Sequence, residues 1–316
     1  MDTEDKIKSK DIIGLVMRST GSWYDVMTNE KEKVECRLRG KFKLDGKKIT
    51  NPIAVGDKVI FEYEGDDKGI ITQILPRRNY IMRKSVHRKH ESHILAANLD
   101  QAVLIATLVF PKTSLGFIDR FLIITESFRI PTIIIFNKID LLDEDGMEYL
   151  NELTDIYQSI GYPCISTSIN EKINIDSFHE ILKNKKSLVA GHSGVGKSSL
   201  VNTINPNLDI KTSEVSTFAN KGVHTTTFAE MFEIEENSYI IDSPGIKELG
   251  LADIEPWEIS HYFPEMRLLL NNCKYHNCTH AHEPGCAVIL GVQQGTIAES
   301  RYINYLSMLN NEDNRR

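Results

Sequence analysis

The sequence predicts a multidomain protein in which an N-terminal β-barrel, a central α/β domain and a small C-terminal metal-binding domain follow one another. Short apolar stretches separated by turn signals predict the barrel. Long apolar strands followed by helical patterns predict the α/β domain, and clustered cysteines and histidines predict the metal site. A chain of 316 residues has room for two or three domains. We expect the domains at residues 1–78, 79–250 and 251–316.

The first predicted domain alternates short apolar stretches with turns over residues 11–75, among them IIGLVM, WYDVM and VGDKVIFEY. This spacing is typical of a small closed barrel. An OB-fold is our first interpretation, and an SH3-like barrel would give much the same pattern. Residues 1–90 hold 20 Lys+Arg against 14 Asp+Glu, whereas the remaining 226 hold 17 against 30. The basic N-terminal part could contact nucleic-acid phosphates or could be a solvated charged surface.

In the second predicted domain, near-continuous apolar strands alternate with amphipathic stretches from residue 100 onward. Parallel sheets covered on both faces require such strands. We predict strands at 102–110, 131–136, 187–191 and 238–244, and helices at 118–128 and 147–160. No apolar run approaches the roughly 18 residues of a membrane span, and the N-terminus lacks an apolar signal core. We therefore expect a cytoplasmic protein without a membrane partner.

A phosphate-binding loop follows the third of these strands. Gly191, Gly196, Lys197 and Ser198 fit the pattern G-x-x-x-x-G-K-[ST] between a strand and a helix. Backbone N–H groups of such a loop surround the phosphates, the lysine supplies positive charge, and Ser198 offers a hydroxyl to Mg²⁺. The residues predicted to bind the nucleotide here are Gly191, His192, Ser193, Gly194, Val195, Gly196, Lys197, Ser198 and Ser199.

Two downstream segments complete the predicted phosphate site. Asp242 ends an apolar strand, where it could reach the metal through water, and an N–H at Gly245 could meet the γ-phosphate. The polar segment 222–230 is of the kind that closes over Mg²⁺, with Thr225 or Thr226 as a hydroxyl ligand, although a threonine-rich strand edge would look similar.

The residue after Gly245 is Ile246, at the place where Ras-like enzymes carry a glutamine that positions water. An apolar side chain cannot orient water, so we predict slow intrinsic hydrolysis. His224 is the nearest candidate for that role, and a plain surface histidine is the alternative.

The nucleotide base is expected to be guanine. Asn137, Lys138, Ile139 and Asp140 follow a predicted buried strand. An aspartate carboxylate accepts hydrogen bonds from both N1–H and the 2-amino group of guanine, a donor pair that adenine lacks. Lys138 would pack its stem along the base, and Asn137 would brace the loop. The stretch 164–168 also closes a strand-like run, so Ser166 and Thr167 could lend N–H groups to the guanine O6, or could be an ordinary strand end.

The guanine motif precedes the phosphate loop, which is the reverse of the order in Ras-like GTPases. Domain termini usually lie near one another, so joining them and cutting the chain elsewhere preserves every contact of the site. We interpret the order as a circular permutation. The segment that responds to γ-phosphate then leads directly into the C-terminal domain, which the nucleotide could thereby reposition.

The C-terminal part begins with short elements, among them a helix that we predict at 264–272, and it carries three of the five cysteines within residues 273–286. Cys273, Cys278, His280 and Cys286 have the spacing C-x4-C-x-H-x5-C, which suits a closed, structural zinc site. His276 and His282 compete for the same role. A small module with little core would gain stability from one structural zinc ion.

The order of these motifs resembles the circularly permuted small ribosomal subunit biogenesis GTPases, the RsgA or YjeQ family. Further stretches that look like its signatures are RLRGKFK, VGDKV, ANLDQ, GVHTTT, DSPGI, YFPEM, EPGCAV and RYINY. The resemblance implies an OB-fold, a permuted GTPase and a zinc domain. It also implies binding to the 30S subunit and 16S rRNA late in assembly, with hydrolysis stimulated by the ribosome.

We therefore expect a monomeric GTP hydrolase that uses Mg²⁺ with GTP, holds one zinc ion and acts on 16S rRNA and the 30S subunit. An RNA-binding switch whose turnover only resets it is a second hypothesis. Metal handling through the Cys/His cluster is a weaker third one, because the predicted site is closed.

Overall fold

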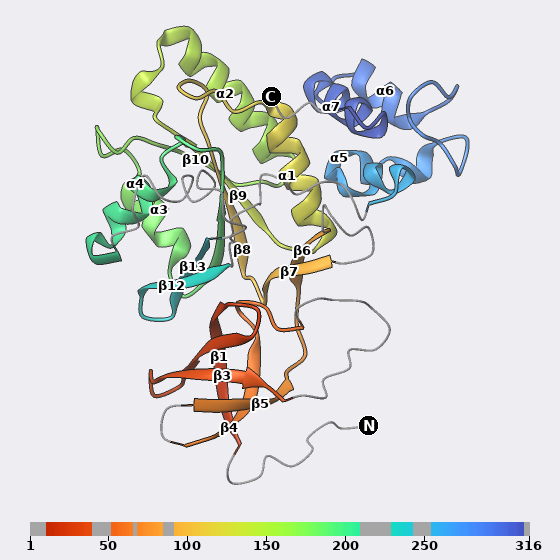
Figure 1. The fold of residues 1–316 in the computed structure, drawn as a ribbon. Coiled ribbons are helices and arrows are strands. Elements are labelled where there is room, and N and C mark those ends of the chain that lie inside the picture. The colour runs from red at the N-terminus through yellow and green to blue at the C-terminus, as the bar shows by residue number, and fades with distance from the viewer. Residues whose placement is uncertain are drawn as a thin grey trace, which may run out of the picture.

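The structure is a computed structural model, and it describes residues 11–39, 52–65, 68–84, 92–208, 229–242 and 254–312. A barrel lies at one end of the molecule, a sheet flanked by helices occupies the middle, and a helical module packs beside that sheet (Figure 1). Among the described residues, no helix combines the length and the apolar character needed to cross a membrane.

The barrel consists of five strands, β1 (Ile12–Ser19), β2 (Trp23–Thr28), β3 (Lys33–Leu38), β4 (Lys58–Tyr63) and β5 (Lys68–Ile74). The strands pair in the order β1-β2-β3-β5-β4, and β4 pairs with β1 to close the ring. Alternate residues of β2 and β3 point inward, as a half-buried strand requires. This five-stranded closure confirms the predicted OB-like barrel.

The barrel core is apolar and tightly packed. Val16, Val26, Phe61 and Ile71 are fully buried in it. A Cβ placed on Gly69 would lie 2.7 Å from both Cys36 Sγ and Phe61 Cδ2. A larger residue at position 69 would therefore push these core side chains apart.

A two-stranded hairpin of β6 (Tyr80–Lys84) and β7 (Ser92–Ala97) connects the barrel to the central sheet. Its approach is fixed by a buried ion pair, in which Arg77 donates to both carboxylate oxygens of Asp57 at 2.7 and 2.6 Å. The barrel also reaches the sheet through one β1–β12 pairing, Arg18 with Glu230.

The central sheet contains β8 (Gln101–Ala106), β9 (Thr132–Asn137), β10 (Cys164–Thr167), β11 (Lys186–Ala190), β12 (Glu230–Glu235) and β13 (Ser238–Asp242). Its strand order is β10-β9-β8-β11-β13-β12, with all neighbours parallel except β12 and β13. The strand before the phosphate loop, β11, is thus central although it comes late in the chain. This arrangement is the predicted doubly wound α/β domain.

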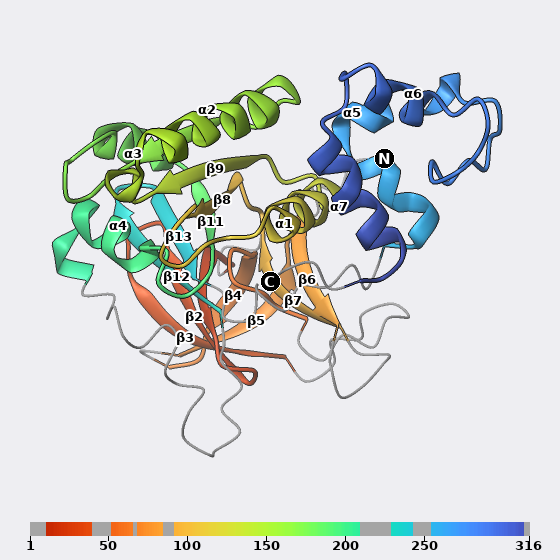
Figure 2. The same ribbon diagram turned by 90° about the horizontal axis from the view of Figure 1, so that it is seen from above.

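Helices cover both faces of this sheet (Figure 2). One apolar cluster packs α1 (Leu115–Ser127) and α2 (Glu144–Ser159) against one face. A second packs α3 (Ile175–Leu182) and α4 (Lys197–Ile204) against the other. In β8, Leu104 belongs to the first cluster and its neighbours Val103 and Ile105 belong to the second. Burial on both faces explains why this strand reads as a continuous apolar run.

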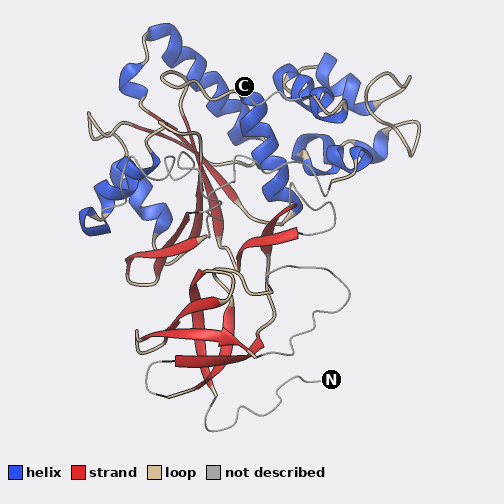
Figure 3. Cartoon of the chain, in the orientation of Figure 1, coloured by secondary structure: helices blue, strands red, loops and turns tan. Residues whose placement is uncertain are grey.

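The C-terminal module comprises η5 (Pro256–Tyr262), α5 (Pro264–Arg267), η6 (Leu270–Asn272), α6 (Ala287–Gln293) and α7 (Glu299–Leu309). Short 3₁₀ segments elsewhere are η1 (Ile139–Leu141) and η2 (Pro206–Leu208). The module shares one apolar cluster with Ile123 of α1, which therefore docks the module onto the sheet domain. Colours in Figure 3 show that helices and loops make up this module.

Two predicted elements differ from the structure. The strand predicted at 102–110 ends at Ala106, because the chain turns through a loop at Thr107–Ser114 before α1 begins. The single helix predicted at 264–272 is broken into α5 and η6, so the chain changes direction before it reaches Cys273.

Candidate nucleotide and metal sites

The predicted nucleotide residues gather at the carboxyl ends of the parallel strands, where open α/β sheets bind their ligands. The phosphate loop joins β11 to α4, and η1 follows β9. Asp242 is the last residue of β13 and pairs with Val189 of β11, so its backbone lies beside the strand that leads into the loop. Its side chain is outside the described part of the chain.

Two glycines give the phosphate loop its shape. Gly191 has φ 147°, and a Cβ there would lie 2.2 Å from the carbonyl oxygen of Ile105. Gly196, which caps α4, has φ 97°, and a Cβ there would lie 2.4 Å from Asn137 Nδ2. Only glycine fits both positions, because each combines a left-handed φ with a close neighbour.

The lysine of the loop points back over it. Lys197 Nζ donates to the carbonyl oxygens of Gly191 and His192 at 2.9 and 2.7 Å. The amino group therefore lies within the curve of the loop, next to the N-terminus of α4. A cation and a helix N-terminus together favour a bound anion.

Asn137 joins the guanine motif to the phosphate loop. Its Nδ2 donates to the carbonyl oxygen of Val195 at 2.8 Å, and its Oδ1 accepts from the hydroxyl of Thr167 at 3.0 Å. Asn137 and Thr167 are both buried. The amide of Asn137 thus links its strand to residues 58 and 30 positions away in the chain.

The Asp140 carboxylate is held at both oxygens. Ser168 Oγ donates to Oδ1 at 2.6 Å, and Asn170 Nδ2 donates to Oδ2 at 2.8 Å. The hydrogen bond from Ser168, followed by that from Asn170, outweighs the effect of burial and lowers the pKa of Asp140. The group is therefore an ionised acceptor, and each oxygen keeps a further lone pair for a ligand donor.

Lys138 adopts a left-handed backbone with φ 64°. Its Nζ donates to the carbonyl oxygen of Phe110 at 2.7 Å. The lysine stem thus runs from η1 toward the loop after β8.

Ser166 and Thr167 lie at the end of β10, but their described bonds support the loop itself. The Thr167 hydroxyl donates to Asn137, and the Ser166 carbonyl accepts from Asn174 Nδ2 at 2.7 Å. Sequence reasoning missed Ser168 and Asn170 as partners of Asp140. The parallel register could have indicated Ser168, because Thr167 pairs with Asn137 and the next residue lies further along the same edge.

The other predicted residues of this site have varied surroundings. The ring of His192 packs on Phe117 of α1, with ring centres 4.0 Å apart, and Val195 is buried. Ile139 packs at the margin of the core. Ser193, Gly194 and Ser199 are exposed, and Ser198 is half-buried. The predicted residues His224, Thr225, Thr226 and Gly245 lie outside the described residues.

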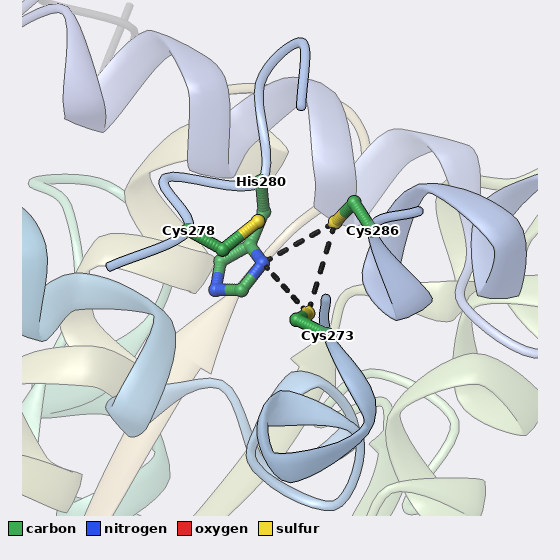
Figure 4. A group of neighbouring side chains, drawn as sticks. All are labelled: Cys273, Cys278, His280 and Cys286. Carbon is green, nitrogen blue, oxygen red and sulfur yellow. Dashed lines mark hydrogen bonds between the residues drawn. The ribbon is translucent and has the colours of Figure 1, made fainter. Parts of the chain in front are cut away.

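A second site lies in the C-terminal module, where the structure brings Cys273, Cys278, His280 and Cys286 together (Figure 4). Their ligand atoms all lie within 4.8 Å of one another. Nδ1 of His280 is 3.6 Å from Cys273 Sγ and 3.4 Å from Cys286 Sγ, and those sulfurs are 4.0 Å apart. Tetrahedral zinc bond lengths imply separations of about 3.6 Å between nitrogen and sulfur and about 3.8 Å between sulfurs. The cluster therefore fits a metal ion in size and donor type.

Neighbouring side chains fix the loop that carries these ligands. Tyr302 donates to the carbonyl oxygen of His280 at 2.7 Å, and Tyr305 donates to that of Thr279 at 2.6 Å. Glu283 accepts from the N–H and the hydroxyl of Thr279 at 2.7 and 2.6 Å. Burial opposes the charge of Glu283, but these hydrogen bonds outweigh it and hold its pKa well below the usual range. The ligand loop is thus held from α7 and from within.

A buried ion network fastens this module to α1. Arg301 of α7 donates to Asp119 of α1 at 2.6 Å and to Glu265 of α5 at 2.8 and 3.1 Å. Asn304 and Tyr157 also donate to Asp119, at 2.6 and 2.9 Å. Burial disfavours the charge of Arg301, but the two carboxylates outweigh it and raise its pKa.

Two family models together match most of the chain. The family model described as RsgA GTPase matches residues 74–252, and that described as RsgA N-terminal domain matches residues 13–71. A Bacteroides fragilis protein named small ribosomal subunit biogenesis GTPase RsgA is 50% identical over 300 residues, which cover 95% of this chain and 97% of that protein. A Flavobacterium johnsoniae protein of the same name is 47% identical over 305 residues, covering 95% and 93%.

Two solved structures are similar throughout. YjeQ from Thermotoga maritima superposes with a TM-score of 0.77 at 36% identity, covering 97% of this chain and 100% of that chain. YloQ, described as a circularly permuted GTPase, gives a TM-score of 0.74 at 27% identity, covering 100% and 99%. The similarity thus extends across the barrel, the sheet domain and the C-terminal module.

Proposed function

Because the chain belongs to the RsgA family and is a GTP hydrolase of ribosome biogenesis, we propose that it binds 16S rRNA on the 30S subunit late in assembly and that the subunit stimulates its hydrolysis. We further propose that it works as a monomer in the cytoplasm. The small subunit is inferred as the partner from the name of the relatives. The nucleotide is inferred from the geometry of the candidate site.

One observation carries the nucleotide assignment. The Asn137–Val195 hydrogen bond joins the guanine motif to the phosphate loop, and Asp140 stands at the same edge with both oxygens oriented. In our proposal Asp140 accepts from guanine, Lys138 covers the base, and the loop Gly191–Ser199 surrounds the phosphates. Bound Mg²⁺ would supply charge neutralisation at the phosphates. Ser198, one of Thr225 and Thr226, and Asp242 through water would hold it.

Water activation is assigned to His224 in this proposal, because Ile246 cannot orient water. Such an enzyme is slow alone and needs its partner to complete the site. Gly245 would meet the γ-phosphate, which makes the segment after β13 the part that responds to hydrolysis.

The metal of the C-terminal module is proposed to be zinc with a structural role. Three thiolates and an imidazole fill a tetrahedral site and leave no position for substrate. The residues that would hold it are Cys273, Cys278, His280 and Cys286. By this proposal the protein divides into the barrel at 1–78, the GTPase domain at 79–250 and the zinc domain at 251–316.

Contact with RNA is proposed for the barrel. Two of its exposed basic side chains pair with acids of the barrel, Lys33 with the partly exposed Asp25 at 2.8 Å and Arg37 with the exposed Glu64 at 2.7 Å. Exposed pairs of this kind contribute about 0–1 kcal/mol, so a phosphate could replace the acid at little cost.

The test is GTP turnover with and without purified 30S subunits. We expect slow turnover alone and a rise of at least tenfold with subunits, and His224→Ala should abolish that rise while GDP binding persists. Equal turnover in both conditions would instead favour a switch whose hydrolysis only resets it.

A further inference from the structure

The loop Thr107–Ser114, between β8 and α1, lies at the same edge of the sheet as the candidate nucleotide site. Its ends are clamped, because Thr113 N donates to the Thr107 carbonyl at 2.8 Å and Thr107 N donates to Thr113 Oγ1 at 3.1 Å. Both threonines are buried. The tip of the loop is therefore held in one shape rather than free in solvent.

The tip touches both halves of the nucleotide site. The Phe110 carbonyl accepts from Lys138 Nζ at 2.7 Å. On the other side, a Cβ placed on Gly194 would lie 3.3 Å from Pro111 Cδ, slightly closer than an ordinary van der Waals contact, so the tip lies directly against the phosphate loop. Residues 110 and 111 thus bridge the guanine motif and the phosphate loop.

Phe110 itself is unusual at this place. Its side chain is 77% exposed, and its backbone has φ 43°, a left-handed conformation that is rare for a bulky residue. Single exposed apolar side chains are common and need no explanation. An aromatic ring held by a strained backbone, between two nucleotide-binding segments, does need one.

We infer that the Phe110 ring is an aromatic wall of the nucleotide pocket and stacks on the purine of bound GDP or GTP. This inference rests on the proposed guanine site. Every purine offers a π-face, so stacking strengthens binding without selecting the base. Base choice stays with Asp140, and the two residues have separable effects.

The experiment compares Phe110→Ala, Phe110→Leu and Phe110→Trp in the full chain, with GDP as the probe. Loss of one aromatic stack weakens binding by roughly tenfold. We therefore expect Phe110→Ala to raise the Kd for GDP by about that factor, Phe110→Leu to raise it less, and Phe110→Trp to keep it. The ratio of GDP to ADP affinity should stay unchanged in Phe110→Ala.

A spectroscopic readout separates stacking from a structural role. In Phe110→Trp the added fluorescence should fall when GDP binds, because a stacked purine quenches an indole. The matched control is Trp257→Ala, since Trp257 is also exposed, at 68%, but lies on η5 of the C-terminal module. That variant should bind GDP as the unchanged protein does, and thermal unfolding checks that each variant is folded.

Two outcomes would overturn the inference alone: wild-type GDP affinity in folded Phe110→Ala, or no fluorescence change in Phe110→Trp, while Asp140→Asn still loses GDP. If the unchanged protein failed to bind GDP, the proposed guanine site itself would fall with it. One set of titrations therefore distinguishes three cases: both proposals hold, only the stacking of Phe110 fails, or the guanine site itself fails.

Discussion

At the residue scale, the Asp140 carboxylate has a defined direction and charge. Ser168 and Asn170 donate to one oxygen each, and their hydrogen bonds, opposed by burial, lower its pKa. A lowered pKa keeps the carboxylate ionised to more acidic pH than a free aspartate. Guanine recognition through Asp140 is accordingly expected to stay constant from neutral to mildly acidic pH.

Asp140→Asn should exchange guanine for xanthine as the preferred base. Its amide can donate to the 2-carbonyl of xanthine but cannot accept both guanine donors. Hydrogen bonds to a charged group contribute about 1.5–3 kcal/mol each, so GDP affinity should fall at least tenfold. Competition binding with GDP, XDP and ADP measures this preference.

The matched control for that change is Ser168→Ala, which leaves the carboxylate and removes one of its supports. It should weaken GDP binding less and keep the preference for guanine. If Asp140→Asn kept the guanine preference of the unchanged protein, Asp140 would not be the residue that reads the base.

The sequence predicts the residues of the candidate nucleotide site, but not how their side chains pair. The spacing of Gly191, Gly196 and Lys197 indicates a phosphate loop because backbone geometry demands glycine there. The bonds from Ser168 and Asn170 to Asp140 join residues 28 and 30 positions apart. Those pairings depend on the register between β9 and β10, which a local sequence pattern does not predict.

At the scale of elements, α1 contacts both the phosphate loop and the C-terminal module. Phe117, near its start, packs on His192. Asp119 binds Arg301, and Ile123 enters the core of the module. One helix therefore contacts both the phosphate loop and the C-terminal module, and a rigid shift of α1 would displace the contacts with each of them.

Arg301→Met should destabilise the docking of the module by about 3–5 kcal/mol, because it leaves Asp119 and Glu265 buried without their cation. The control is Arg267→Ala, which removes an exposed pair with Glu126 at 3.3 Å and should cost no more than about 1 kcal/mol. Chemical denaturation gives the free energy of unfolding of each variant, and the rate of hydrogen exchange in α7 reports how firmly the module is docked. Equal stability of the two variants would contradict the role given to the buried network.

Element boundaries show where sequence patterns lose information. Apolar residues continue past Ala106, so the sequence predicts strand to residue 110, whereas a clamped loop begins at Thr107. The run 264–272 predicts one helix, but η6 must turn the chain toward Cys273. In both places tertiary contacts override a local pattern. The pair Arg301–Asp119, 182 residues apart, has no local signature at all.

At the scale of the whole molecule, the permuted order has a structural basis. The strand order β10-β9-β8-β11-β13-β12 places β11 between β8 and β13, so the phosphate loop sits beside the guanine motif although the motif precedes it in the chain. The sequence order of β8 to β13 is therefore compatible with one continuous site. Permutation also places the C-terminal module after β13, the strand that ends at Asp242.

Removal of the metal should loosen the C-terminal module more than the barrel or sheet. A structural zinc ion would hold its ligand loop together, and the described part of the module packs in an apolar cluster that it shares with Ile123 of α1. We expect about one zinc ion per chain by elemental analysis, its loss in Cys273→Ser, and faster hydrogen exchange in α6 and α7 after chelation. Cys164→Ser is the control, because Cys164 lies in β10, and it should keep the metal. Full metal content in Cys273→Ser would refute the assignment of this ligand.

Binding to the small subunit should depend steeply on salt and on the nucleotide. A basic barrel that contacts phosphates releases counterions, and each contact adds about −0.7 to −0.9 to the slope of log affinity against log salt. The slope should become shallower when Lys33 and Arg37, two exposed basic residues of the barrel, are changed to alanine. Lys183→Ala, whose exposed pair with Glu180 lies on the sheet domain, should leave it unchanged.

Because γ-phosphate is proposed to act through the segment after β13, a non-hydrolysable GTP analogue should bind the subunit more tightly than GDP does, with the same salt slope. A difference in slope between the two nucleotides would mean that the nucleotide changes the phosphate contacts themselves, and the barrel would then be part of the switch rather than a constant anchor.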